Sequence, residues 1–284
     1  MKLMNRIFTS ICVAVLLSAS VFAQDFIVKV GDLKTASKDA VVVDVYTAAN
    51  YGKMHIDKAI NIFHKDLYKT GDIEGVIKDP VELAKIFGDK GINVDSKIII
   101  YDNGSQKYNS RVFWILKYMG AKNVYLLHKD MDQFRKARVR LTRKPGAFSS
   151  TTFVPAINDN VIANTSEVLK VIKNNSAIII DARDAVEYAG NEKGSKGHIK
   201  NAINIDYKLF LDDKGAYKSK TEIAQLAKSK GLSTEKDIIV YCASSIRAAV
   251  IYVALKEILG YENVKVYDEA YNTMVVKHPE MIVK

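Results

Sequence analysis

The chain has 284 residues, of which 48% are hydrophobic, and a formal net charge of +10 at pH 7. This length allows two domains with cores of ordinary size, and the basic balance suits small anionic substrates or a lysine-rich solvated surface. Its densest basic run, residues 135–144, has no aromatic residue among its charges, which argues against nucleic acid as a partner.

Residues 1–23 have the pattern of a secretory signal peptide. Lys2 and Arg6 precede a short apolar run, and the predicted cleavage site follows Ala23. The run is shorter than the roughly 20 apolar residues of a spanning helix, and no later stretch reaches that length. We therefore expect a periplasmic or secreted protein with no stable membrane insertion after cleavage; an uncleaved anchor is the alternative.

One cysteine remains in the predicted mature chain. Cys12 lies in the signal segment, which leaves Cys242 without an intramolecular disulfide partner. An unpaired cysteine in an exported protein indicates a reactive thiol or an intermolecular bridge.

The mature chain contains one unit twice. A buried strand that ends on an aspartate is expected at 40–45 and again at 177–182, and the sequence His-Ile-x-x-Ala-Ile-Asn-Ile begins at both His55 and His198. Each copy exceeds 100 residues and can bury its own core, so we predict two domains and not a solenoid. Their predicted ranges are 24–143 and 161–284, joined by a linker rich in Pro, Gly, Ser and Thr at 144–160.

Within each copy, runs of Val and Ile alternate with helical segments. Helices are expected at 80–90 and at 221–230, the second opened by Thr221 as its N-cap and closed before Gly231. Strands without polar alternation, separated by helices, predict an α/β fold with a doubly wound parallel sheet in each domain.

Four apolar β-formers at 238–241 lead into Cys242, followed by a small polar loop and a helical stretch at 248–255. Such a loop lies at the carboxyl edge of a parallel sheet, where free N–H groups meet the positive end of the helix dipole. Together with Arg247, this setting favours the thiolate, which is the nucleophilic form. The alternative is that Cys242 is a small buried hydrophobe.

The two copies differ at the positions that carry chemistry. The first copy has Asp102 where the second has Cys242, Tyr46 where the second has Arg183, and Lys107 where the second has Arg247. A carboxylate cannot perform thiolate chemistry and repels anions. The first copy is therefore predicted to be catalytically inactive, and the joint loss of the cysteine and a cation favours a catalytic Cys242.

Several motifs now resemble those of the two-domain rhodanese family of thiosulfate and mercaptopyruvate sulfurtransferases. They are Asp181-Ala182-Arg183 with Glu187-Tyr188, residues 197–205, Tyr241-Cys242 with its loop, Tyr267-Asp268, and in the first half Tyr101-Asp102 and Ser110-Arg111-Val112-Phe113-Trp114. The resemblance implies two tandem rhodanese-like domains, with the amino-terminal one inactive and the cysteine in the carboxyl-terminal one.

The resemblance also implies a mechanism without a cofactor or metal. Cys242 would take the outer sulfur of a donor as a persulfide and pass it to cyanide or a thiol. The N–H groups of the loop would surround that sulfur, and Arg183 and Arg247 would bind the donor's anionic end. The loop residues concerned are Ala243, Ser244, Ser245 and Ile246. The Cys-x4-Arg spacing is one residue shorter than the Cys-x5-Arg loop of related phosphatases, which favours sulfur over phosphorus.

The loop departs from the family pattern at several points. Ser245 stands where the family often has Gly, a strained choice if that residue has a positive φ. Ala243 and Ser244 replace the basic pair typical of thiosulfate-specific members. We expect thiosulfate or a polysulfide as donor, with mercaptopyruvate as an alternative. A sulfur carrier that serves a periplasmic partner enzyme, or a structural or thiol-redox role, also remains open.

Two further residues have twins in the inactive copy. His198 is matched by His55, and Asp181 is matched by Asp44. We therefore interpret His198 and Asp181 as structural supports of the site. The five histidines are scattered and give no metal-ligand spacing.

Overall fold

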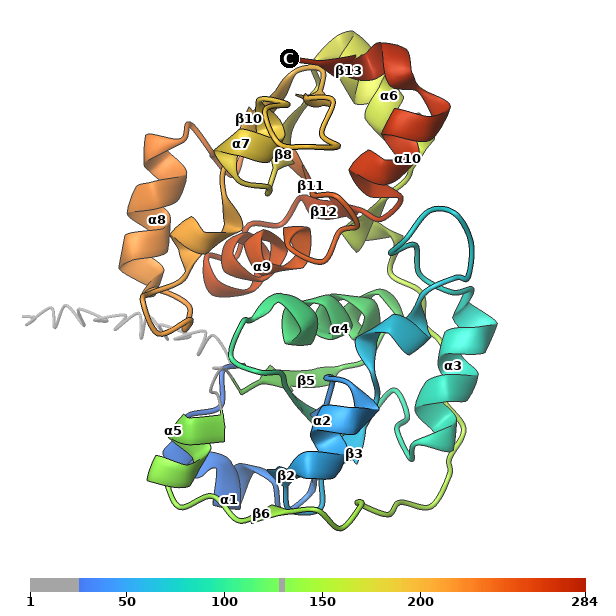
Figure 1. Cartoon of the computed structure of the whole chain (residues 1–284), viewed down its shortest axis with the longest axis vertical. Helices are drawn as coiled ribbons and strands as arrows, with labels where there is room; N and C mark the ends of the chain where they lie inside the picture. The colour runs from blue at the N-terminus through green and yellow to red at the C-terminus, as the bar shows by residue number, and fades with distance from the viewer. Residues whose placement is uncertain (1–25, 128–130) are drawn as a thin grey trace, which may run out of the picture.

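The computed structural model describes residues 26–127 and 131–284, so the predicted signal segment lies outside the described residues. The chain forms two α/β halves that lie one above the other in Figure 1. Within the described residues, no helix combines the length and apolar character that crossing a membrane requires.

The first half is built on a four-stranded parallel sheet with the order β3-β1-β4-β5. A short antiparallel pair, β2 with β6, lies beside it. The strands are β1 (Ala40–Asp44), β2 (His55–Ile56), β3 (Ile60–Asn61), β4 (Lys97–Tyr101), β5 (Asn123–Leu126) and β6 (Leu141–Thr142). The helices are η1 (Val30–Asp32), α1 (Leu33–Ala36), α2 (Ala48–Lys53), η2 (His64–Leu67), α3 (Pro80–Asp89), α4 (Lys107–Tyr118) and α5 (Met131–Lys136).

The second half repeats this plan with a five-stranded parallel sheet in the order β10-β8-β11-β12-β7, and an antiparallel pair of β13 with β9. The strands are β7 (Ile162–Ala163), β8 (Ala177–Asp181), β9 (His198–Ile199), β10 (Ala202–Asn204), β11 (Asp237–Tyr241), β12 (Val264–Tyr267) and β13 (Ile282–Val283). The helices are η3 (Asp159–Val161), α6 (Thr165–Asn174), α7 (Ala185–Tyr188), η4 (Tyr207–Phe210), α8 (Lys220–Ser229), α9 (Ala248–Tyr252), the π-helix η5 (Val253–Ile258), α10 (Ala270–Lys277) and η6 (Pro279–Met281).

The register of the central strands brings the candidate residues to one edge. Tyr241 is opposite Asp181 in the β11–β8 pair, so Cys242 and Arg183 both follow the carboxyl ends of neighbouring strands. The first half has the same arrangement, with Tyr101 opposite Asp44. The predicted α/β fold with parallel sheets in both halves is confirmed.

The two halves share one hydrophobic core. Helices α4 and α9 face each other at the centre of Figure 1, and their buried side chains belong to a single cluster that reaches both sheets. The outer face of each sheet has a separate core. Trp114 is fully buried, and its Nε1 donates to the carbonyl of Val161 at 2.9 Å, which links α4 to the second half. The loop that precedes α9 is therefore held at the boundary between the halves.

Two helix ends differ from the sequence prediction. The prediction of Thr221 as a cap is wrong, because α8 begins at Lys220 and Ser219 is its N-cap. Ser219 and Glu222 form a reciprocal capping box, which satisfies two of the free N–H groups at the helix start. The helix predicted at 248–255 starts as expected at Ala248 but widens into a π-helix from Val253 onward.

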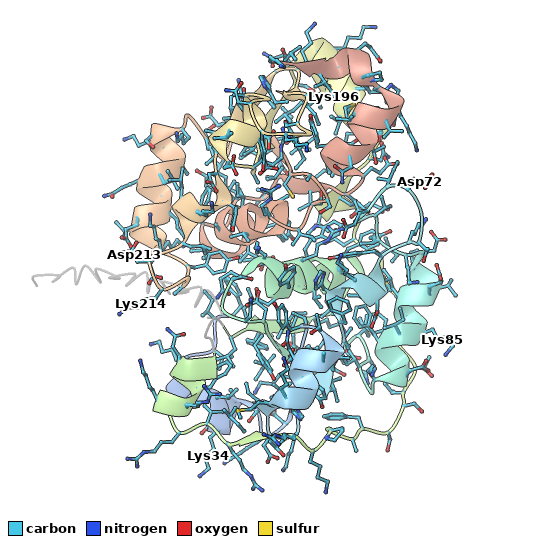
Figure 2. The ribbon with its side chains drawn as sticks, in the orientation of Figure 1. Lys34, Asp72, Lys85, Lys196, Asp213 and Lys214 are labelled. Atoms are coloured by element: carbon cyan, nitrogen blue, oxygen red, sulfur yellow. The ribbon has the colours of Figure 1, made fainter. Side chains whose placement is uncertain are left out.

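The excess positive charge lies on the outside of the molecule. Lys34, Lys85 and Lys214 are exposed and extend from its periphery in Figure 2. A solvated basic surface of this kind keeps a protein soluble without specifying a partner.

A buried histidine near the boundary predicts a loss of stability in acid. His64 stacks on Tyr108 with ring centroids 4.1 Å apart, and its Nδ1 is 3.1 Å from the hydroxyl of Tyr68. Burial first, and then the nearby charges of Lys65 and Arg111, lower the pKa of His64 to about 4. The unfolded chain, with a histidine pKa near 6.5, therefore binds this proton at a higher pH than the folded chain does.

Between pH 7 and pH 4.5, we expect the unfolding free energy of the wild type to fall by about 2 kcal/mol more than that of His64→Phe. Urea denaturation at each pH measures the difference. His278→Phe, at a partly exposed position, is the control and should retain the wild-type slope. Equal pH slopes in the wild type and His64→Phe would show that His64 is not the group responsible.

Candidate active site

Cys242 lies at the floor of a cavity between the two halves. The residue follows β11 directly and is only 1% exposed, yet it lines a hollow of about 250 Å³. The walls include Lys107 and Tyr108 from the start of α4, and Tyr207 and Lys208 from η4. A larger hollow of about 540 Å³ lies near the starts of β8 and β11, but no cysteine lines it. The thiol chemistry therefore belongs to the smaller cavity.

The loop 242–247 presents unpaired backbone donors. The carbonyls of Cys242 and Ala243 accept hydrogen bonds at 3.1 Å from the N–H groups of Tyr271 and Asn272 in α10. In the described part of the chain, the amides of residues 243–247 have no hydrogen-bond acceptor. Because unpaired amides at a helix start attract negative charge, this loop can hold an anion beside the sulfur.

Ser245 has the left-handed conformation that its position demands. Its φ is +59°, and the residue is fully buried. The left-handed region costs a non-glycine residue about 1 to 2 kcal/mol. The hydroxyl of Ser245 donates a short hydrogen bond to the carbonyl of Tyr267, an interaction that glycine cannot make. This bond offsets the strain and joins the loop to the end of β12.

Arg247 is held by a carboxylate of the same half. Its Nη2 donates to Oε1 of Glu187 at 2.9 Å, and its Nη1 forms a shorter bond with Oε2. Burial opposes the charged form of Arg247, but the hydrogen bond to Glu187 and the charges of Cys242 and Glu187 outweigh burial and raise the pKa of the guanidinium. Arg247 thus lines the cavity as a cation whose charge is shared with Glu187.

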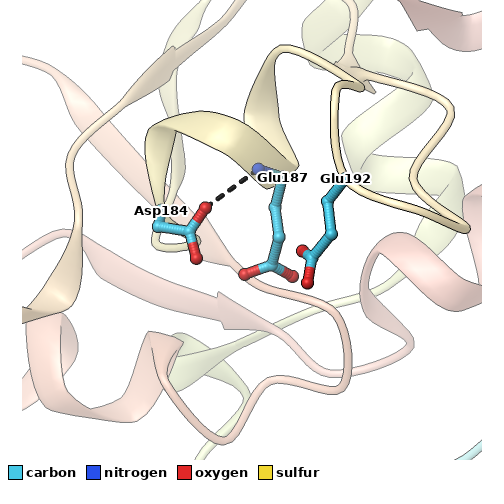
Figure 3. A group of neighbouring side chains, drawn as sticks. All are labelled: Asp184, Glu187 and Glu192. Atoms are coloured by element: carbon cyan, nitrogen blue, oxygen red, sulfur yellow. Dashed lines mark hydrogen bonds between the residues drawn. The ribbon is translucent and has the colours of Figure 1, made fainter.

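Glu187 belongs to a group of three carboxylates, shown in Figure 3 with Asp184 and Glu192. One oxygen from each lies within 4.8 Å of the others. Asp184 caps α7 by accepting from the N–H groups of Val186 and Glu187, at 3.0 and 2.9 Å, so two of the three already have structural partners. Asp184 therefore stabilises the start of α7, and Glu187 in that helix orients Arg247.

The structure does not bring Arg183 to the cavity. Its Nη2 donates to Asp181 at 2.6 Å and to the carbonyl of Gly197 at 2.7 Å, and its guanidinium lies 3.8 Å from the ring centroid of Tyr271. The side chain is 1% exposed. The expected direct contact between Arg183 and the donor does not match this geometry, because the adjacent aspartate at the strand end takes up the guanidinium. Arg183 instead joins β8 to α10.

His198 also lies away from the cavity lining. It stacks on Tyr188 at 3.7 Å, and its Nδ1 is 3.1 Å from the carbonyl of the same tyrosine. His55 makes the equivalent pair with Tyr51, at 3.7 Å between rings and 2.7 Å from Nδ1 to the carbonyl. The geometry is thus repeated in the half that has no cysteine.

The corresponding loop of the first half is filled by its own side chain. The carboxylate of Asp102 accepts from the N–H of Gly104 at 2.7 Å, the hydroxyl of Ser105 at 2.8 Å and the N–H of Tyr108 at 3.2 Å. Burial raises the pKa of Asp102, although these hydrogen bonds oppose the rise. The donors that remain free around Cys242 are here occupied by a built-in anion.

Several residues that line the cavity belong to none of the motifs recognised in the sequence. Tyr108, Tyr207 and Lys208 come from segments far from Cys242 in sequence. The internal repeat contains one indication of this arrangement: Lys107, which corresponds to Arg247 in the other copy, lines the same cavity as Arg247. Twin loops that face each other across a boundary could have indicated a site shared by both copies.

Comparisons with known proteins identify the family to which both halves of the chain belong. The rhodanese-like domain model matches residues 29–137 and 164–275. A putative thiosulfate sulfurtransferase of Mycobacterium leprae is 27% identical over 80% of this chain and 93% of its own length. The sulfur carrier protein TtuD of Thermus thermophilus is 28% identical over 80% of this chain and 92% of its own.

A solved structure has the same fold as this chain. The 3-mercaptopyruvate sulfotransferase SseA of Escherichia coli superimposes with a TM-score of 0.79 at 26% identity, covering 87% of this chain and 98% of its own. The two matches to the domain model occupy most of the chain, one in each half. The chain therefore belongs to the rhodanese-like family and is a sulfurtransferase built from two tandem rhodanese-like domains.

Proposed function

We propose that this sulfurtransferase moves sulfane sulfur from thiosulfate or a polysulfide to cyanide or a thiol, through a persulfide on Cys242. The observation that carries the proposal is the loop itself: a cysteine on the floor of a cavity, followed by amides 243–247 that have no acceptor in the described part of the chain. These fixed dipoles stabilise anionic sulfur without reorganising during the reaction.

The transfer has two balanced steps. The Cys242 thiolate attacks the outer sulfur of thiosulfate, the sulfur–sulfur bond of the donor breaks, and sulfite leaves with the electron pair. The acceptor, cyanide or a thiolate, then attacks the terminal sulfur of the persulfide, and Cys242 leaves as the thiolate. Each step exchanges one nucleophile for another, so no external oxidant or reductant is required.

The charge of the cavity favours an anionic donor. Among the described residues, three cations line it, Lys107, Lys208 and Arg247, together with two carboxylates, Asp184 and Asp206. Arg247 pairs with Glu187 and Lys208 lies 3.9 Å from Asp206, so Lys107 is the lining cation that has no carboxylate partner among the described residues. Lys107 comes from the cysteine-free half, and the donor would therefore be bound by both domains.

The names of the relatives differ in the sulfur donor that they state and in whether they describe an enzyme or a sulfur carrier. They include thiosulfate sulfurtransferases, a 3-mercaptopyruvate sulfurtransferase and a sulfur carrier protein. We favour thiosulfate or polysulfide because export would separate this chain from mercaptopyruvate, an intracellular metabolite. A carrier that delivers its persulfide to a partner enzyme is the second candidate, supported by the similarity to TtuD along most of both chains.

Sulfur loading identifies the nucleophile and the donor. After incubation with thiosulfate, tetrathionate, polysulfide or mercaptopyruvate in turn, intact mass spectrometry should show one added sulfur atom with thiosulfate or polysulfide. Cys242→Ser should show none, because it lacks the attacking thiolate. An added sulfur atom on Cys242→Ser would refute a persulfide on Cys242. An added sulfur atom with mercaptopyruvate alone would refute thiosulfate and polysulfide as donors. Repeated turnover with cyanide supports the enzyme, whereas release of sulfur only to a partner supports the carrier.

Neutralising either cavity lysine tests the donor site. We expect Lys107→Gln and Lys208→Gln each to raise the KM for thiosulfate about fivefold, with a smaller effect on kcat, because each removes one charge near the bound anion. Steady-state kinetics at low ionic strength measure the change.

Lys65 provides a matched control for this experiment. It occupies the position in η2 that Lys208 occupies in η4, and both lysines are exposed. Lys65, however, pairs with Glu74 at 2.6 Å and does not line the cavity. Lys65→Gln should keep the wild-type KM. Wild-type KM values in both cavity variants would mean that these lysines do not bind the donor.

We also propose that residues 1–23 direct export of the chain. The charged start and short apolar run of this segment support the proposal. Expression of the full chain in a Gram-negative host should yield periplasmic protein whose N-terminal residue is Gln24. Recovery of an uncleaved chain from the cytoplasm or the membrane fraction would contradict it.

A further inference from the structure

An ion pair at the domain boundary joins two of the motifs found in the sequence. Arg111 lies in α4 of the first half, and Asp268 follows β12 in the second half. Nη2 of Arg111 donates to Oδ1 of Asp268, and the two side chains are 0% and 5% exposed. The motifs are 157 positions apart, and only the packing of the halves brings them together.

The same pair anchors a segment of the first half, residues 69–78, which we call the cover hairpin. Nη2 of Arg111 also donates to the carbonyl of Gly75 at 2.8 Å, and Oδ2 of Asp268 accepts from the N–H of Ile77 at 3.1 Å. Tyr68 and Ile77 form a β-bridge at the base of the hairpin. One ion pair thus holds the hairpin by two backbone groups.

The cover hairpin packs directly on the loop that carries Cys242. Gly75 has a φ of +100°, and a Cβ placed there would lie 2.6 Å from both Cβ and the carbonyl oxygen of Ser244. No side chain fits between these two backbones. Ser244 lines the reaction cavity two residues after Cys242, so the position of the hairpin bears on the shape of the loop.

Stability alone does not account for the ion pair. Arg111 is fully buried, and no hydrogen-bond partner for its Nε and Nη1 is found within residues 26–127 and 131–284. The guanidinium is instead covered by the ring of Trp114, at 4.6 Å from its centroid. Burying a charge with unsatisfied donors costs free energy, and apolar replacements of such pairs are often neutral or stabilising.

We propose that Arg111 and Asp268 are positioning residues for sulfur transfer. They press the cover hairpin of the cysteine-free domain against Ser244 and thereby fix the backbone of the Cys242 loop, whose amides must surround the transferred sulfur. The inference rests on Cys242 as the reacting thiol in the proposed function.

The second half contains a matched control. Its own hairpin, closed by a bridge between Leu211 and Tyr217, places Gly215 at a φ of +73°, where a Cβ would lie 2.5 Å from the carbonyl oxygen of Gly104. Gly104 belongs to the loop of Asp102, which has no cysteine. In Figure 2, the labels of Asp72, at the right, and Asp213, at the left, mark the two hairpins at opposite ends of the boundary.

The test compares Gly75→Ala with Gly215→Ala. Both substitutions strain a left-handed glycine and push a hairpin from the opposite loop, so both should lower the unfolding midpoint. We expect only Gly75→Ala to lower kcat, about tenfold, with thiosulfate and cyanide as probes, because small displacements of reacting groups cost large factors in rate. Gly215→Ala should retain kcat within twofold. Equal losses in both variants, or wild-type kcat in folded Gly75→Ala, would overturn the proposal.

Alkylation of Cys242 by iodoacetamide provides a readout that does not depend on the donor. We expect Gly75→Ala to slow this reaction by a similar factor and Gly215→Ala to leave it unchanged. If the wild type does not use thiosulfate but the alkylation rates differ in this way, the proposed donor fails and the positioning role stands. Equal alkylation rates in all three proteins would refute that role.

A second variant covers the case in which Gly75→Ala does not fold. Arg111→Met combined with Asp268→Asn removes both charges together, so no unpaired charge is left buried. We expect this double variant to fold and to show the same tenfold loss in kcat and in the alkylation rate, because the carbonyl of Gly75 has lost its anchor. Wild-type values for both rates would contradict a positioning role for the ion pair.

Discussion

The structure of the site depends on the backbone amides that follow the central strand of each half. A parallel strand that feeds a helix leaves N–H groups at the carboxyl edge of the sheet, and these groups need an anion or another acceptor. In the first half, the carboxylate of Asp102 supplies that acceptor within the loop. In the second half, Cys242 occupies the corresponding place, and the amides of the loop have no acceptor among the described residues. One fold therefore yields a loop filled by its own carboxylate in one half and a loop with free amides beside a thiol in the other.

The half without a cysteine still contributes to the site. Lys107 and Tyr108 form part of the wall above Cys242, and Gly75 packs on Ser244. The facing helices α4 and α9 share one core, so these contacts are fixed by the same packing that holds the halves together. The half without a cysteine thus supplies part of the wall of the cavity that contains Cys242.

Two arginines of the second half are paired with carboxylates, so they fix the geometry of the site and add little net positive charge to it. Arg183 is paired with Asp181 and joins β8 to α10, while Arg247 is paired with Glu187 at the edge of the cavity. Each guanidinium has a bidentate carboxylate partner, a geometry that fixes direction as well as charge. The lysines of the cavity lack such close partners in the described structure: Lys208 is 3.9 Å from Asp206, and Lys107 lies over the ring of Tyr108. Because Asp184 and Asp206 also line the cavity, attraction of an anion by this site would depend mainly on Lys107.

The sequence by itself determined the duplication, the parallel α/β fold, the exchange of Asp102 for Cys242 and the loop between strand and helix. These features depend on local spacing and on residue types that recur within each copy. Only the tertiary structure decided that Arg183 turns toward Asp181, that Lys208 and Tyr108 line the cavity, and that Arg111 meets Asp268. Those contacts depend on how the two halves pack and on which of several nearby partners a long side chain reaches, and hydrophobic periodicity along the chain encodes neither.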